Sequence, residues 1–257
     1  FKQKTAYEIR LSLVGSEMCI RDRVRGINPM LTPEERKDAI KGVPEGLILL
    51  NELIDERRKN PGDDFLSTLI LAEDQGSKLS NLEMCALVGA VLGAGSDTAV
   101  DLHSYLIKTL LQHPDQLDEL KNDESLVQGA ISETLRYESS GKTGLARYAS
   151  EDIELNGHEI KKGQMVQLIT STAGMDPKIY ENPRKFDIRR DHDKSISFGQ
   201  GPHYCIGVTL VRSQTEVMLK ELFKRFPNLS LGNEIIYDYD HHNARRMDVM
   251  TVQTNLN

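Results

Sequence analysis

The stretch FGQGPHYCIG, residues 198–207, places one cysteine in a short segment that is rich in glycine. Gly199, Gly201 and Gly207 allow the backbone to turn sharply and to approach a flat ligand where a Cβ atom would clash. A helical pattern follows Cys205 and extends over residues 206–226. The N–H groups at the start of that helix would point to the sulfur and favour its thiolate form, which is the form that binds metals. The segment therefore predicts that Cys205 is a metal ligand.

The other cysteines do not indicate a disulfide framework. The chain has three cysteines in all, an odd number, and no CxxC pair occurs among them. Cys85 lies in an apolar helical stretch, where a single cysteine usually acts as a small buried hydrophobic residue. A reducing compartment fits this usage.

The residues around Cys205 carry a resemblance to a known family. The pattern FGxGxHxCxG is similar to the haem-binding signature of the cytochrome P450 family, and every fixed position of it is present. The resemblance implies a haem b whose iron takes Cys205 as its axial thiolate ligand. It also implies that His203 contacts a haem propionate, that Phe198 lies over the sulfur, and that Gly199 and Gly201 line the cofactor.

A second segment, GAGSDT at residues 93–98, lies inside an apolar helical pattern. Glycine inside a helix costs about 1 kcal/mol relative to alanine, so a loosened turn that can admit water or ligand is expected here. Asp97 and Thr98 add an acid and an alcohol that are suited to relaying protons. Alternatively, the small residues allow close helix packing and Thr98 bonds a carbonyl of the preceding turn. The segment resembles the family motif AGx(D/E)T, which implies a role in oxygen handling, although Ala99 replaces a second threonine.

Four further charged residues are assigned through the same resemblance. Taken alone, Glu133 and Arg136 form an i,i+3 pair on a helix surface, with a value of a few tenths of a kcal/mol. The pair matches the ExxR motif of the family, and Arg190 completes the family segment PxxFxxxR. This implies a buried network that holds the cysteine loop. Arg147 matches an arginine that binds the other propionate; the alternative is an exposed charge on a strand.

The pattern of apolar residues predicts a mainly α fold with a minor β-sheet. Helices are expected over residues 32–58, 65–72, 80–112, 125–137 and 206–226, the third of them opened by a capping box at Ser80 and Glu83. A hairpin is expected over residues 146–160 with its turn at Asn156-Gly157. Further strands are expected at residues 165–169 and near the C-terminus.

The first 23 residues differ in pattern from the rest of the chain. They resemble translated sequencing-adapter read-through, and we exclude residues 1–23, Cys19 included, from the fold prediction; the alternative is an ordinary disordered tail. The resemblance to the cytochrome P450 family covers residues 47–252 and begins midway through the family's fold. We therefore expect residues 24–257 to be the C-terminal part of a single cytochrome P450 domain, truncated at the N-terminus.

The resemblance implies a bacterial-type haem-thiolate monooxygenase, which inserts one oxygen atom of O2 into an apolar or amphipathic organic substrate. Its electrons would come from a ferredoxin or flavodoxin and an NAD(P)H reductase. As an isolated fragment, the chain is expected to bind haem poorly and to be inactive. Two alternatives stay open: a haem-thiolate peroxygenase or isomerase that needs no electron donor, and an inert helical fragment without haem.

Charge and hydropathy exclude some partners. A net charge of −7 argues against nucleic acid, which usually requires a basic face. The longest apolar run without charges, residues 84–95, is shorter than the roughly 20 residues that a membrane span needs. We therefore expect no membrane segment in this chain. The spacing from Arg136 to Cys205 resembles that of soluble bacterial members of the family, which implies a cytoplasmic location.

Overall fold

The computed structural model describes residues 31–41, 43–72, 79–139, 144–238 and 245–254. The chain divides into two compact units, Phe1–Asp97 and Thr98–Asn257. The boundary falls within one long helix, α5 (Asn81–Gln112). The expectations for residues 1–23, including Cys19, lie outside the described residues.

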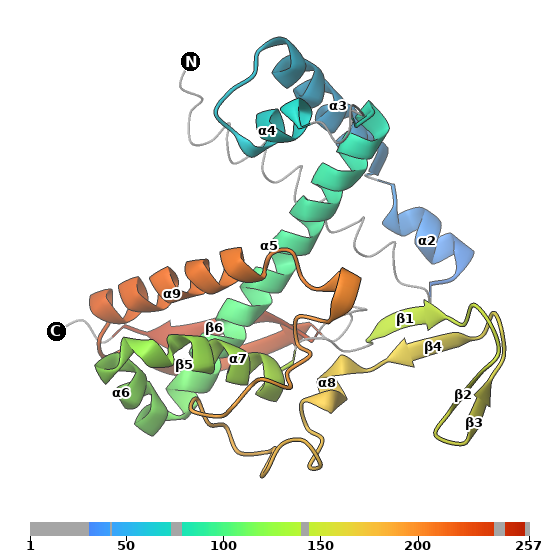
Figure 1. Cartoon of the computed structure of the whole chain (residues 1–257). Coiled ribbons are helices and arrows are strands. Elements are labelled where there is room, and N and C mark those ends of the chain that lie inside the picture. The colour runs from blue at the N-terminus through green and yellow to red at the C-terminus, as the bar shows by residue number, and fades with distance from the viewer. Residues whose placement is uncertain (1–30, 42, 73–78, 140–143, 239–244, 255–257) are drawn as a thin grey trace. The chain divides into compact units, whose positions relative to one another are not determined.

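The first unit is helical throughout its described part. It contains α2 (Pro33–Ala39), α3 (Val43–Lys59), α4 (Phe65–Leu71) and the first part of α5 (Figure 1). Polar side chains cap the starts of α2, α4 and α5. At α2, Thr32 and Glu35 form a capping box, and at α5 Ser80 and Glu83 form the same reciprocal pair of hydrogen bonds. At α4, the Asp64 carboxylate accepts a hydrogen bond from the Ser67 N–H. A small apolar core joins α3, α4 and the first part of α5, and its buried residues are Ile54, Ile70, Met84 and Cys85. The predicted burial of Cys85 is confirmed.

Four helices build the core of the second unit. They are the second part of α5, α6 (Pro114–Asn122), α7 (Val127–Tyr137) and α9 (Val208–Arg225), with the 3-10 turn η1 (Glu124–Leu126) leading into α7. The core residues are Leu102, Leu106, Leu110, Leu117, Leu120, Val127, Ala130, Ile131, Phe186, Ile188 and Leu219. Helix α6 was not predicted, although Pro114 at its first turn and the buried Leu117 and Leu120 are its local signals.

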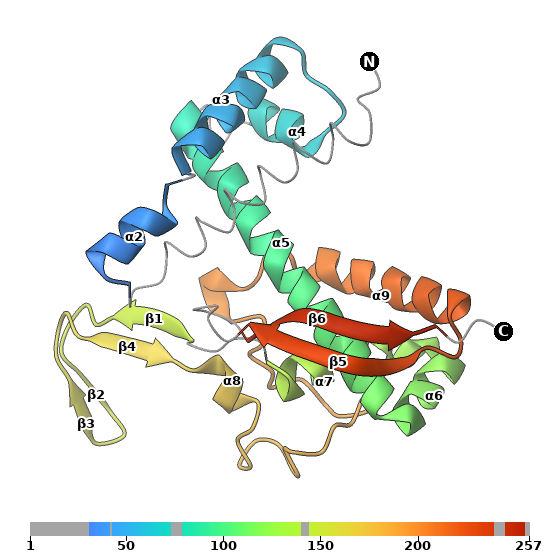
Figure 2. The same ribbon diagram turned by 180° about the vertical axis from the view of Figure 1, so that it is seen from behind.

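Within the described residues, the strands form three separate antiparallel pairs. Strand β1 (Leu145–Tyr148) pairs with β4 (Met165–Leu168), β2 (Ile153–Leu155) with β3 (His158–Ile160), and β5 (Ser230–Asp238) with β6 (Arg246–Gln253) (Figure 2). The short helix α8 (Thr170–Ala173) follows β4.

The hairpin predicted over residues 146–160 was wrong in its extent. The predicted first strand, residues 146–155, is divided into β1 and β2 by a bend at residues 150–151. Strand β1 then pairs with β4, and only β2 pairs with β3 across the predicted turn. Asp152 stabilises that bend by accepting the backbone N–H of Lys162 at 2.8 Å. The turn itself lies where it was predicted, with Asn156 and Gly157 at φ 51° and 79°.

Helix α5 is long and apolar enough, by length and composition, to cross a membrane. The expectation of no membrane segment relied on the charge-free run at residues 84–95, whereas the whole of α5 is 32 residues long. The core helix of a soluble protein passes the same test, and Leu102, Leu106 and Leu110 of α5 are buried in the core of the second unit. The length of α5 is therefore weak evidence for a membrane span.

Candidate functional site

The cysteine loop is a tight turn that two glycines make possible. Gly199 and Gly201 have φ values of 77° and 65°, in the left-handed region that favours glycine. The backbone N–H of Cys205 donates to the carbonyl oxygen of Phe198 at 2.9 Å, which closes the loop. Within it, the Tyr204 N–H donates to the Gly201 carbonyl at 3.0 Å. The loop presents Cys205 as an exposed free thiol.

Helix α9 begins three residues after Cys205, two residues later than predicted. Gly207 is its N-cap residue, and the Val208 N–H donates to the Cys205 carbonyl at 3.4 Å. A Cβ atom added at Gly207 would meet only the Cys205 sulfur, at 3.9 Å. Glycine at this position therefore leaves one side of the sulfur open, next to the first turn of the helix.

The surroundings of Cys205 suit a cofactor that brings most of the metal ligands itself. Tyr204, Ile206 and Leu210 expose an apolar surface beside the thiol, and Ile206 is 90% exposed. Within the described part of the chain, no group of three or more His, Cys, Asp or Glu residues could hold a metal ion. A haem supplies four ring nitrogens and a flat apolar face, so that a single thiolate suffices. The residues present therefore fit a haem.

His203 and Arg147, the predicted propionate ligands, both lie in the second unit with exposed side chains. His203 ends the 3-10 turn η2 (Gly201–His203), two residues before Cys205. Arg147 lies on β1 opposite Val166, and its guanidinium donates to the carbonyl of Ala146 at 2.9 Å. Both side chains can donate hydrogen bonds to a carboxylate.

Asp97 and Thr98 lie on α5, which is α-helical from Asn81 to Gln112. The expected loosened turn at residues 93–98 is therefore not seen. Helix formation is cooperative, so the good helix-forming residues on both sides outweigh about 1 kcal/mol per glycine. Asp97 is half-buried and Thr98 is exposed. The unit boundary lies between them, so Asp97 is described with the first unit, and Thr98 and Cys205 with the second.

Glu133, Arg136 and Arg190 form one network around a buried carboxylate. The side chains of Glu133 and Arg136 are both 0% exposed and are joined by two hydrogen bonds of 2.7 Å. Arg190 lies 3.3 Å from the same carboxylate, and the backbone N–H of Asp187 donates to it at 2.8 Å. The surface pair that the sequence alone suggests is thus a buried ion pair with a second arginine.

The two arginines also bind the segment that precedes the cysteine loop. Arg136 donates to the carbonyls of Gly174 and Pro183 at 2.8 and 2.7 Å, and Arg190 donates to the Glu181 carbonyl at 2.7 Å. Residues 174–190 contain no helix or strand, so their backbone groups lack the regular hydrogen bonds of secondary structure. The bonds from the two arginines supply some of the missing partners.

His192 is a member of this network that the sequence analysis missed. Its side chain is 12% exposed, and its Nε2 atom lies 3.6 Å from the Glu133 carboxylate. Within the described residues, neither ring nitrogen has a hydrogen-bond partner. Burial lowers the pKa of His192, and the positive charges of Arg136 and Arg190 lower it further while Glu133 opposes them. No local motif marks this histidine, because its role depends on burial.

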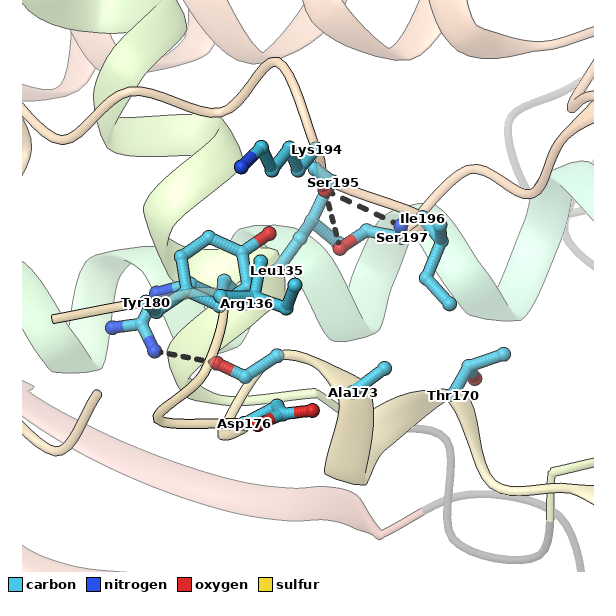
Figure 3. A pocket seen from close by; sticks show the side chains of 12 residues that line it. Leu135, Arg136, Thr170, Ala173, Asp176, Tyr180, Lys194, Ser195, Ile196 and Ser197 are labelled. Atoms are coloured by element: carbon cyan, nitrogen blue, oxygen red, sulfur yellow. Dashed lines mark hydrogen bonds between the residues drawn. The ribbon is translucent and has the colours of Figure 1, made fainter. Parts of the chain in front are cut away.

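A pocket of about 200 Å³ lies beside the network (Figure 3). Arg136 and Tyr180 form one part of its lining, and residues 194–197, which lead directly into Phe198, form another. The hydroxyls of Ser195 and Ser197 bond to each other at 3.1 Å in this wall. The pocket is thus bounded by the charged network and by the segment that enters the cysteine loop.

Comparisons with known proteins show which family the chain resembles. The family model described as Cytochrome P450 matches residues 34–234. The Epothilone C/D epoxidase of Sorangium cellulosum is 39% identical over 220 residues, which are 85% of this chain and 52% of that protein. The 6-deoxyerythronolide B hydroxylase of Saccharopolyspora erythraea is 37% identical over 79% of this chain and 50% of its own length.

A solved structure, that of epothilone D-bound cytochrome P450epoK, has a TM-score of 0.87 at 35% identity. The match covers 95% of this chain and 61% of that one. The chain thus spans about half the length of the curated relatives it matches.

Proposed function

Because the chain belongs to the cytochrome P450 family, we propose that it supplies the cysteine-ligand part of a haem-thiolate monooxygenase. The observation that carries the proposal is the exposed Cys205 thiol. It lies in a turn that requires glycine at positive φ and stands at the start of α9, beside exposed apolar side chains.

The proposed reaction inserts one oxygen atom of O2 into a C–H or C=C bond of an organic substrate. The other oxygen atom takes up two electrons and two protons and leaves as water. The electrons come from NAD(P)H through a reductase and a ferredoxin or flavodoxin. A bound haem b supplies the iron at which O2 is activated.

The residues of this chain have separate roles in the proposal. Cys205 would provide the thiolate ligand of a bound haem, with Phe198 in the same loop. His203 and Arg147 would donate hydrogen bonds to its propionates. Asp97 and Thr98 would hold and move protons. Glu133, Arg136 and Arg190 take no part in the chemistry and stabilise the segment before the cysteine loop.

The proposed substrate is an apolar or amphipathic organic molecule of the polyketide or macrolide class. The names of the relatives support this choice: one is an epothilone epoxidase, another hydroxylates 6-deoxyerythronolide B, and a further similar structure contains a mycinamicin. We place the enzyme in the bacterial cytoplasm, where its electron donors would be available.

The reduced, CO-bound absorption spectrum tests the proposal. The purified 257-residue chain is expected to show no Soret band at the position characteristic of a thiolate ligand after haem addition. The full-length protein that contains this chain is expected to show the band and to lose it in Cys205→Ala.

Two results would contradict these expectations. If the full-length protein binds haem and keeps the thiolate band in Cys205→Ala, Cys205 is not the ligand and the proposed function fails. If the 257-residue chain shows the band by itself, the expectation of poor haem binding is wrong.

A further inference from the structure

Arg212 lies in the first half of α9 and reaches out of that helix in two directions. On one side its guanidinium donates to the Gln128 side-chain oxygen at 2.8 Å and to the Ser132 hydroxyl at 3.0 Å, both on α7. On the other side its Cζ atom lies 5.3 Å from the centre of the Phe198 ring. The Arg212 side chain thus links α9 and α7 to the cysteine loop.

The contact with Phe198 continues to Cys205 through the backbone. The carbonyl oxygen of Phe198 accepts the N–H of Cys205 at 2.9 Å. A guanidinium over an aromatic ring is an attractive arrangement, and the planar fork of arginine can bond two acceptors while its face meets the ring. The order of contacts is therefore α7, Arg212, Phe198 and Cys205.

Helix α9 has a separate anchor one turn later. Thr215 is fully buried, and its hydroxyl lies 2.9 Å from Nε2 of His103 on α5. Leu219, also buried, joins the core of the second unit. Because these residues hold α9, loss of Arg212 would release the loop more than the helix.

We propose that Arg212 is a positioning residue for Cys205: it holds the Phe198 ring from the α7–α9 interface and so sets where the loop presents the sulfur. The proposal deepens the proposed function and rests on it for the meaning of the sulfur's position. The contacts join residues of this chain to one another, so they can be tested without added haem.

The experiment measures the loop of the 257-residue chain directly. Hydrogen exchange of the Cys205 amide and alkylation of its thiol by iodoacetamide are followed by mass spectrometry, which separates the Cys205 peptide from those of Cys19 and Cys85. The variants are Arg212→Gln, Phe198→Leu and the double substitution. The matched control is Arg225→Gln, which removes an exposed arginine paired with Glu221 on the same helix.

Arg212→Gln and Phe198→Leu are each expected to raise the exchange rate about fivefold, as loss of a contact of cation–π strength would. The double variant is expected to exchange no faster than the faster single variant, because both substitutions break the same contact. Alkylation is expected to change in each variant, and both readouts to stay unchanged in Arg225→Gln. Urea unfolding of each variant shows whether global stability accounts for the change.

Unchanged exchange in Arg212→Gln would overturn the proposal, and so would effects that multiply in the double variant. The proposal would also be overturned if the rise in the exchange rate were fully explained by the loss of global stability. Arg212 would then only join α7 to α9 and would not position the loop. A missing Soret band in the full-length protein would refute the proposed function and leave these exchange results unaffected.

Discussion

Glu133 is a carboxylate without exposure to solvent, and it has Arg136, Arg190 and His192 within 3.6 Å. A buried charge is tolerated only when it is paired and hydrogen-bonded. Here the two arginines also bind backbone carbonyls of residues 174, 181 and 183. The energetic importance of Glu133 therefore comes from its burial, because the same ExxR pair on a helix surface would contribute little.

Replacement of Glu133 by Gln is expected to lower the free energy of unfolding by about 3–5 kcal/mol, because it leaves Arg136 buried without its counter-charge. Urea unfolding followed by circular dichroism measures the change. The control is Glu221→Gln, which removes one partner of an exposed i,i+4 pair and should cost less than about 1 kcal/mol. A loss below about 1 kcal/mol in Glu133→Gln would show that the network is not a major source of stability.

Two histidines of the second unit predict how stability depends on pH. Burial lowers the pKa of both His103 and His192 below the ordinary value of 6.5. The unfolded chain therefore binds protons at a higher pH than the folded chain, and stability should fall as the pH drops below 6.5. Urea unfolding at pH 7, 6 and 5 should show this fall, with a smaller fall in His192→Gln. Equal slopes for the two proteins would show that His192 does not contribute.

At the scale of elements, α7 owes its position to a missing side chain. A Cβ atom added at Gly129 would lie 2.1 Å from the carbonyl oxygen of Ile188, in the segment that carries Arg190. The helix and this segment can approach each other only because Gly129 has no side chain. The same approach brings Glu133, one turn later on α7, to the backbone N–H of Asp187.

Gly129→Ala is therefore expected to lower the free energy of unfolding by about 1–3 kcal/mol, since backbone must move to relieve the clash. The matched control is Gly95→Ala in α5, where an added Cβ meets nothing within 4 Å. That control should raise stability by up to about 1 kcal/mol, the helix preference of alanine over glycine. Urea unfolding of both variants checks the pair, and a stabilised Gly129→Ala would refute the packing argument.

At the scale of the whole molecule, the second unit combines a large core with an open site. Its core is built from α5, α6, α7 and α9, whereas Tyr204, Ile206 and Leu210 beside Cys205 remain exposed. An exposed apolar surface of this kind usually meets a ligand or another part of a protein. The chain spans about half the length of its curated relatives. We therefore expect the full-length protein to retain haem and the 257-residue chain to retain little, which the absorption spectra of the two purified proteins compare.

Much of the fold could be predicted from the sequence because it depends on neighbouring residues. Capping residues mark the starts of α2 and α5, and Asn156-Gly157 marks a turn that needs positive φ at both positions. Helix α6 and the pairing of β1 with β4 were missed. The first is short, and the second joins residues some twenty positions apart, which no local pattern specifies.

The candidate site divides in the same way. The sequence by itself determined the cysteine loop, because glycine at positive φ beside a cysteine and a helix start is a local requirement of the backbone. The family resemblance already implied that Glu133 is buried, but only the tertiary structure decided that His192 joins it and that Arg212 meets the ring of Phe198. The physical reason is that burial and side-chain contacts depend on segments distant in the chain, which local periodicity does not record.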